Sequence, residues 1–236
     1  MTATIAVPAM TTTRRGGPSA MGALALGGFG IGTTEFATMG LLPQMATTFG
    51  ISIPAAGHAI TFYALGVVVG APLIAGLAAR LPRKGLLIGL MIALAVGNGL
   101  SAMAPNATLL MAARFLAGLP HGAFFGIAAV VATGLVPPER RGTAVARIMV
   151  GLTLANLVGV PFATAAGQQI GWRVVYLAVA AIAIATACAL ARWLPRMPAA
   201  HDASPAAELR AFRRPQAWFA LLTGMICFGG MFAVYS

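Results

Sequence analysis

Charge is scarce in this sequence. Only 8% of its 236 residues are charged, whereas a soluble domain carries about one quarter. Acidic residues are the scarcest, because four Asp and Glu stand against 15 Lys and Arg, for a net charge of +11. Hydrophobic residues make up 59% of the chain. So few charged side chains cannot cover a globular core with a polar surface, which excludes an ordinary soluble domain.

Cysteine and lysine are also rare. The two cysteines, Cys188 and Cys227, lie in apolar segments, which predicts small buried hydrophobic side chains rather than a disulfide or a metal pair. The single lysine, Lys84, lies between two apolar segments. No apolar segment therefore offers the lysine that a seven-helix photoreceptor needs for a retinal Schiff base.

Two further functional classes lack their sequence signals. The motifs Gly-x-Ser-Gly, His-Glu-x-x-His and Gly-x-Gly-Asp are missing, so the chain is not expected to be an intramembrane enzyme, and no cofactor or metal site is predicted. Nucleic-acid-binding proteins gather their basic residues on one soluble face. Here the basic residues lie in short runs between apolar segments, so no nucleic-acid partner is predicted.

Long apolar stretches dominate what remains. About 20 apolar residues cross a bilayer as a helix, and long runs without alternation of apolar and polar residues exclude a membrane β-barrel. The sequence therefore predicts an all-α membrane protein. The six expected spans are 20–43, 55–79, 85–104, 108–136, 144–168 and 174–194, and a seventh begins near Gln216.

The loop charges predict the orientation. All basic residues except Arg114 and Arg173 fall in the N-terminal tail or in alternate loops, and such loops face the cytoplasm in multi-pass proteins. The predicted organisation is a cytoplasmic N-terminal tail (1–19), a six-span bundle (20–194), a cytoplasmic linker (195–215) and a seventh transmembrane helix (216–236) that belongs to an incomplete second bundle.

Glu35 is the only acid inside a predicted span. A charge at the centre of a membrane helix costs about 2.5–3.5 kcal/mol on insertion scales. A rise of about 1.5 Å per residue puts Glu35 about 12 Å and Arg114 about 9 Å below the same membrane surface. The two residues are therefore expected to share a cavity or to pair directly. They are either a structural ion pair or a proton-coupling site with a proton- or substrate-responsive carboxylate.

Other polar residues inside the spans are candidates for a substrate pathway. His121 lies seven residues after Arg114, near the same helix face, and histidine can titrate near physiological pH. A histidine held by a neighbouring helix is the alternative interpretation. Asn98 and Asn156 either bridge helices or face substrate, with Asn156 favoured for substrate, and Tyr63 completes the predicted pathway.

The fifth predicted span resembles the antiporter motif of the drug/proton antiporters in the major facilitator superfamily. The resemblance rests on Gly151, Gly159 and Pro161, although Val160 separates the last glycine from the proline. Such a helix is thin and bent, so it is expected to pack against a partner bundle and limit leakage.

Two further motifs resemble the same superfamily. Gly76, Arg83 and Lys84 lie in the turn where it carries a glycine–acid–basic gate motif, and Arg80 stands at the place of the acid. The segment from Arg114 to Gly118 resembles the motif whose arginine is linked with proton coupling. Four segments are similar to arabinose/sugar efflux permeases and to chloramphenicol or purine exporters, namely Thr34-Glu35-Phe36, 40–43, 137–141 and 171–173.

The resemblance implies two six-helix bundles that move by alternating access around a central site. It further implies proton-coupled efflux of small organic molecules across a bacterial inner membrane. The expected partners are a small-molecule substrate, protons and the lipid bilayer. The chain is expected to be truncated, and transport then needs the missing C-terminal bundle or a second copy. The alternative is a non-transporting or half-size membrane protein that acts only as an oligomer.

Overall fold

The computed structural model describes residues 17–78, 81–196 and 215–235, and within those ranges the chain is helical without strands. Most of the predicted tail, Arg80 and most of the predicted linker lie outside the described residues. The helices are α1 (Gly17–Phe49), α2 (Ile53–Ala78), α3 (Arg83–Met103), α4 (Ala107–Gly134), η1 (Pro138–Arg140), α5 (Arg141–Leu154), η2 (Ala155–Gly159), α6 (Val160–Ile170), α7 (Trp172–Trp193) and α9 (Pro215–Tyr235).

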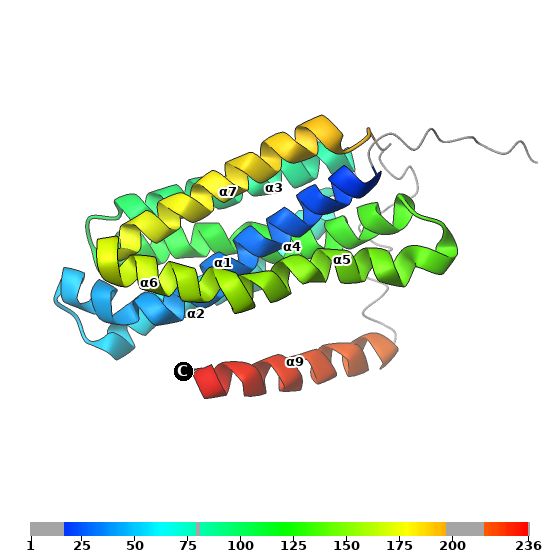
Figure 1. The fold of residues 1–236 in the computed structure, drawn as a ribbon. Helices are drawn as coiled ribbons and strands as arrows, with labels where there is room; N and C mark the ends of the chain where they lie inside the picture. Colours follow the sequence, from blue (N-terminus) through cyan, green and yellow to red (C-terminus); the bar gives the residue numbers. More distant parts are fainter. Residues whose placement is uncertain (1–16, 79–80, 197–214, 236) are drawn as a thin grey trace, which may run out of the picture.

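The helices α1 to α7 form a bundle in which α7 lies along α3 and α1 runs between that pair and α5, whereas α9 lies apart from the bundle (Figure 1). The fifth predicted span, 144–168, corresponds to α5, η2 and α6 in succession, and the short helix η1 precedes it. Five helical segments are long and apolar enough to cross a membrane, namely Ile53–Ile74, Arg83–Met103, Ala107–Gly134, Pro138–Ile170 and Trp172–Trp193. The hydropathy pattern confirms five of the six predicted spans.

The first predicted span, α1, is the exception. It has 33 residues, which is more than enough to cross a membrane. It is nevertheless less apolar than the five segments named above and is not among them. Its threonines, its glycines and Glu35 lower its hydropathy. It packs against α2, α5 and α7, so its place in the bundle comes from packing and not from a strongly apolar surface.

The end of α1 also corrects the sequence analysis. The segment after Pro43 was expected to be a loop, but α1 continues to Phe49 with Pro43 inside the helix. The helix ends where Gly50 adopts a φ of 64°, a left-handed conformation that glycine reaches without strain. The Ile51 amide then donates to the Ala46 carbonyl oxygen over 3.0 Å. The stop signal is therefore glycine and not the preceding proline.

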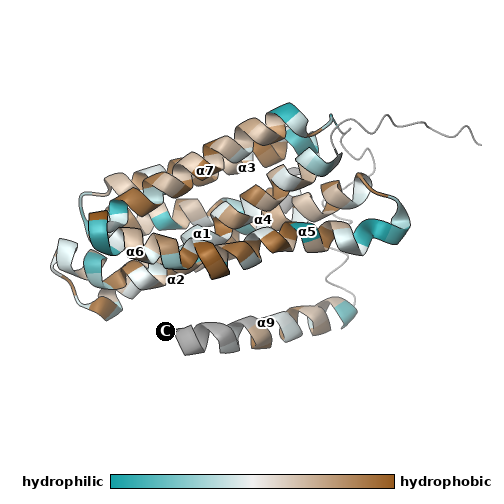
Figure 2. Ribbon diagram, viewed as in Figure 1, coloured by the Kyte–Doolittle hydropathy of each residue, from teal (hydrophilic) through white to brown (hydrophobic). Residues whose placement is uncertain are grey.

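Both cysteines are free, and both are exposed. The prediction that Cys188 and Cys227 are buried was therefore wrong. Many other apolar side chains also point outward, including Leu157 and Phe162, which are 72% and 74% exposed, while hydrophilic residues gather at the helix ends (Figure 2). Because lipid is itself apolar, a membrane helix does not need to bury its apolar side chains against protein.

Close helix pairs are built on glycine. A Cβ at Gly118 of α4 would overlap the carbonyl oxygen of Tyr63 in α2, and a Cβ at Gly66 of α2 would overlap that of Phe115 in α4. Small residues at such positions let two backbones touch. This contact brings α2 and α4 together at the depth of Tyr63 and His121.

Candidate functional site

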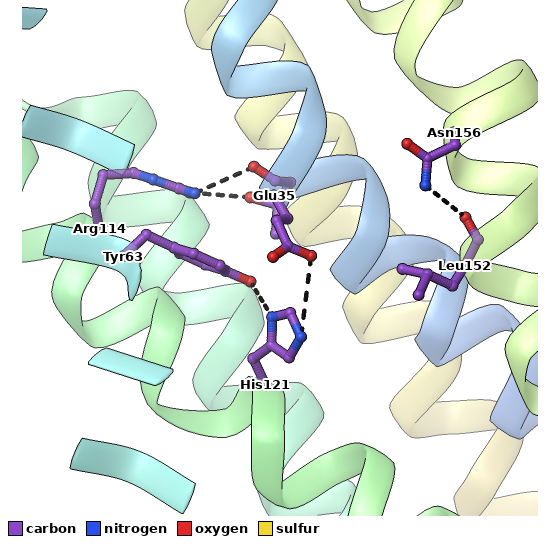
Figure 3. A network of polar contacts seen from close by, with 7 residues as sticks. Glu35, Tyr63, Arg114, His121, Leu152 and Asn156 are labelled. Atoms are coloured by element: carbon purple, nitrogen blue, oxygen red, sulfur yellow. Dashed lines mark hydrogen bonds and ion pairs between the residues drawn. The ribbon is translucent and has the colours of Figure 1, made fainter. Parts of the chain in front are cut away.

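Glu35, Tyr63 and His121 meet between α1, α2 and α4 (Figure 3). The Tyr63 hydroxyl lies 3.1 Å from His121 Nδ1, and His121 Nε2 lies 4.0 Å from Glu35 Oε2. The His121 and Glu35 side chains are 14% and 19% exposed, whereas Tyr63 is buried. The carboxylate therefore lies at the edge of the bundle interior and remains partly exposed.

Arg114 is fully buried and is held by neutral groups. Its Nη1 donates to Thr34 Oγ1 over 2.9 Å and to Asn98 Oδ1 over 3.4 Å, and its Nη2 donates to the Thr34 carbonyl oxygen over 3.1 Å. Among the described residues, no ion pair within 4.0 Å joins Arg114 to Glu35. The expected direct pair is therefore not formed, although the two residues do share one cluster.

Two tyrosine rings enclose the guanidinium. Arg114 Cζ lies 4.4 Å from the centre of the Tyr63 ring and 5.0 Å from that of Tyr176. Such cation–π contacts stabilise a desolvated charge by about 2 kcal/mol. The Tyr176 hydroxyl in turn lies 3.1 Å from Thr38 Oγ1. We call Glu35, Tyr63 and His121, with Thr34, Asn98, Arg114 and Tyr176, the polar cluster.

The polar cluster contains residues that sequence reasoning missed. Thr34 and Tyr176 had no predicted role, although a phenol hydroxyl near the start of an apolar span was a usable signal for Tyr176. Asn98 was predicted to bridge helices or to face substrate, and it bridges. It accepts from Thr34 Oγ1 over 2.5 Å as well as from Arg114.

Gly118 links the predicted arginine motif to the cluster. It lies between Arg114 and His121 on α4 and touches the backbone of Tyr63. Residues three or four apart share a helix face. Because Gly118 has no side chain, Tyr63 can lie against both Arg114 and His121 on that face. In this structure the motif therefore builds the site by close packing as well as by charge.

The predicted substrate residue Asn156 lies apart from the polar cluster (Figure 3). It is exposed on η2, and its Nδ2 donates to the Leu152 carbonyl oxygen over 3.2 Å. The segment η2 is π-helical, and the Val160 amide donates to the Ala155 carbonyl five residues back. Pro161 follows directly and has no amide hydrogen to give. The widened turn therefore accommodates the proline, as in other π-bulges.

The antiporter-like glycines pack inside the bundle. A Cβ at Gly151 would overlap the carbonyl oxygen of Ala25 in α1, and one at Gly159 would lie 2.6 Å from Thr33 Oγ1. These two glycines therefore face the described helix α1, and the expectation that this span packs against a partner bundle concerns its other faces and stays a prediction. The opposite side of the segment carries the exposed Leu157 and Phe162.

In the segment that resembles the gate motif, the basic residue Lys84 bonds to backbone carbonyl oxygens. Lys84 Nζ donates to the carbonyl oxygens of Ala191 and Leu194 over 2.7 and 2.6 Å, at the C-terminal end of α7, where a helix favours a cation. Gly76 has open space where a side chain would be, and Arg83 begins α3. Lys84 therefore joins α3 to α7.

Comparison with known proteins identifies the family. The family model of the Major Facilitator Superfamily matches residues 24–236 of the sequence. The chain belongs to this superfamily. It is a family of membrane transporters and not of enzymes.

Individual curated proteins that resemble this superfamily member support the same assignment. The inner membrane transport protein YdhP of Escherichia coli is 48% identical over 214 residues, which cover 91% of this chain and 55% of YdhP. A chloramphenicol resistance protein of Streptomyces lividans is 33% identical over 210 residues, 87% of this chain and 54% of that protein. The chain thus spans about half the length of the curated relatives that it matches.

A solved structure shows the same fold. The proton:xylose symporter XylE superposes with a TM-score of 0.64 at 19% identity, covering 75% of this chain and 44% of that one. At this identity the likeness concerns the fold. The six-helix arrangement predicted from the sequence is therefore confirmed as that of a major facilitator bundle.

Proposed function

We propose that this chain supplies the Glu35-bearing six-helix bundle of a proton-coupled exporter of small organic molecules. The exporter works by alternating access in a bacterial inner membrane. The observation that carries the proposal is the contact of 4.0 Å between Glu35 and His121 at a partly open edge of the bundle. An acid at membrane depth is a functional site by default.

The polar cluster suits a carboxylate that gains and loses a proton. A direct bidentate pair with arginine holds a carboxylate firmly in one arrangement. Here Arg114 is occupied by Thr34 and Asn98, so it contributes a positive charge nearby without binding Glu35. Glu35 stays available for a proton from the open side, and His121 stands beside it as a second proton acceptor.

This arrangement supports the exchange of a proton for a substrate. An ionised Glu35 is attracted to the Arg114 charge and to a protonated His121, and protonation of Glu35 removes that attraction. A change of this kind can bias which side of the membrane the cavity faces. Asn156, exposed on η2, is proposed to contact the substrate when the cavity is complete, and Tyr63 and His121 line the pathway.

A second bundle is part of the proposal. The major facilitator architecture places two bundles around a central site, and the outward side chains of Leu157 and Phe162 offer an apolar surface for such a neighbour. The partner bundle comes either from a longer form of the same polypeptide or from a second copy.

The test is transport in everted vesicles from cells that express the gene at its natural length. Chloramphenicol and arabinose serve as probes, and a pH-sensitive dye reports proton movement. We expect Glu35→Gln to reduce probe-driven proton movement to the background of empty vesicles. Glu139→Gln, at an exposed acid in η1, is the matched control and should retain it.

The alternatives separate cleanly. Full proton movement in the Glu35→Gln variant, at equal expression, would contradict the proton-coupling role. Probe uptake without proton movement in the parent protein would leave a transporter of another coupling type. No transport of any probe, with the protein running as an oligomer, would favour the half-size, non-transporting alternative.

A further inference from the structure

The His121 ring lies between two partners of different chemistry. Its Nδ1 is 3.1 Å from the Tyr63 hydroxyl, and its Nε2 is 4.0 Å from a Glu35 carboxyl oxygen. A neutral imidazole carries its proton on one nitrogen only. These distances fit either tautomer, so the partners decide which nitrogen carries the proton.

Glu35 favours a proton on Nε2. An ionised carboxylate only accepts hydrogen bonds, so an unprotonated Nε2 would turn a lone pair toward negative oxygens. At 4.0 Å the two atoms are beyond direct hydrogen-bonding distance, but the electrostatic repulsion still acts at this distance. A proton on Nε2 changes the repulsion into attraction.

Tyr63 favours the same tautomer from the other side. With the proton on Nε2, Nδ1 has a free lone pair, and the phenol hydroxyl can donate to it. Within the described part of the chain, His121 is the one hydrogen-bond partner recorded for this hydroxyl. Arg114 lies over the face of the Tyr63 ring and does not compete for its oxygen.

The surroundings fix the ring without supplying another proton donor. Phe125 lies 5.5 Å from the His121 ring centre in a tilted arrangement, and the Tyr63 ring lies 5.8 Å away, edge to face. The charged and titratable groups that face the cluster are Glu35 from α1, Tyr63 from α2, Arg114 from α4 and Tyr176 from α7.

We propose that Tyr63 is a positioning residue that holds neutral His121 in the tautomer protonated at Nε2, the atom that faces Glu35. When His121 is protonated on both nitrogens, the same hydroxyl rotates and accepts from the Nδ1 proton, so the ring keeps its orientation in both charge states. The inference deepens the proposed exporter mechanism and rests on it only for its importance in transport.

The experiment reads the ring directly. His58→Gln and His201→Gln leave His121 as the only histidine, and the chain is labelled with ¹⁵N-histidine in lipid nanodiscs. Ring-nitrogen chemical shifts then give the tautomer ratio. We expect the Nε2–H tautomer to dominate. Tyr63→Phe should move the ratio about fivefold toward Nδ1–H, the equivalent of one neutral hydrogen bond.

Tyr176→Phe is the matched control. It also removes a hydroxyl beside Arg114, but that hydroxyl contacts Thr38, so the His121 ratio should stay unchanged. Glu35→Gln is a second variant. Its amide presents either a donor or an acceptor, so the preference for Nε2–H should weaken without loss of the Tyr63 bond.

Two results would overturn the inference. One is an Nδ1–H tautomer that dominates in the parent chain, and the other is an equal ratio in the parent and in Tyr63→Phe. The spectra need no transport, so a failed vesicle assay leaves this result standing. Conversely, the tautomer ratio could be the same in the parent and in Tyr63→Phe while Glu35→Gln loses proton movement. That combination would overturn this inference and leave the proposed function standing.

Discussion

At the scale of single residues, Arg114 is a buried charge held by several hydrogen bonds. It is fully buried, and its two terminal nitrogens together donate to three oxygens from α1 and α3. Lysine keeps the charge but lacks the planar fork of donors. Arg114→Lys should therefore leave some of these acceptors without a partner and lower the free energy of unfolding by about 1–3 kcal/mol.

Thermal unfolding in detergent measures this loss, with Arg173→Lys as the control. Arg173 also contacts aromatic rings, but it donates to a single recorded acceptor, the Ala104 carbonyl oxygen at 3.0 Å. Its replacement should cost less. Equal stability of both variants would mean that the hydrogen bonds of Arg114 do not hold the cluster together.

At the scale of elements, the contact between α2 and α4 positions the polar cluster. A methyl group at Gly118 would overlap the carbonyl oxygen of Tyr63, whereas Gly126 on the same helix has open space around it. Overpacking of a close contact costs about 1–3 kcal/mol. Gly118→Ala should therefore destabilise the protein and displace Tyr63 from His121.

Gly126→Ala gives the comparison on the same helix. Alanine is the better helix former by about 1 kcal/mol, so this variant should match or exceed the parent in melting temperature. The two melting curves, recorded in the same detergent, check the contact between helices α2 and α4. A Gly118→Ala variant that is as stable as Gly126→Ala would contradict it.

At the scale of the whole molecule, the distribution of charge predicts how the bundle is oriented in the membrane. The basic residues at the start of α3, in the η1 segment and at the end of α7 lie at one end of the bundle (Figure 1). The positive-inside rule predicts that this end faces the cytoplasm. In a Cys188→Ser, Cys227→Ser background, Pro105→Cys should react with an impermeant maleimide added to intact spheroplasts.

Glu139→Cys, at the opposite end, should react only after the membrane is permeabilised. Both positions are exposed, so burial does not separate them. Labelling of Glu139→Cys in intact spheroplasts, with Pro105→Cys protected, would reverse the predicted topology. It would also place the N-terminus outside.

The sequence by itself determined the membrane class and the approximate positions of six helices, and it singled out Glu35 as the one acid inside a predicted span. Hydropathy and charge act locally along the chain, so composition and spacing reveal them. The same local reasoning failed for the end of α1, because Gly50 and not Pro43 ends that helix.

Only the tertiary structure decided which side chains from different helices contact one another. Counting residues gives the depth of Glu35 and Arg114 in the membrane, but each residue also turns the helix by about 100°, and packing sets that rotation. The rotation placed His121 beside Glu35 and put Thr34 and Asn98 around Arg114. It likewise turned Gly151 toward α1, since backbones approach most closely where both helices present small residues.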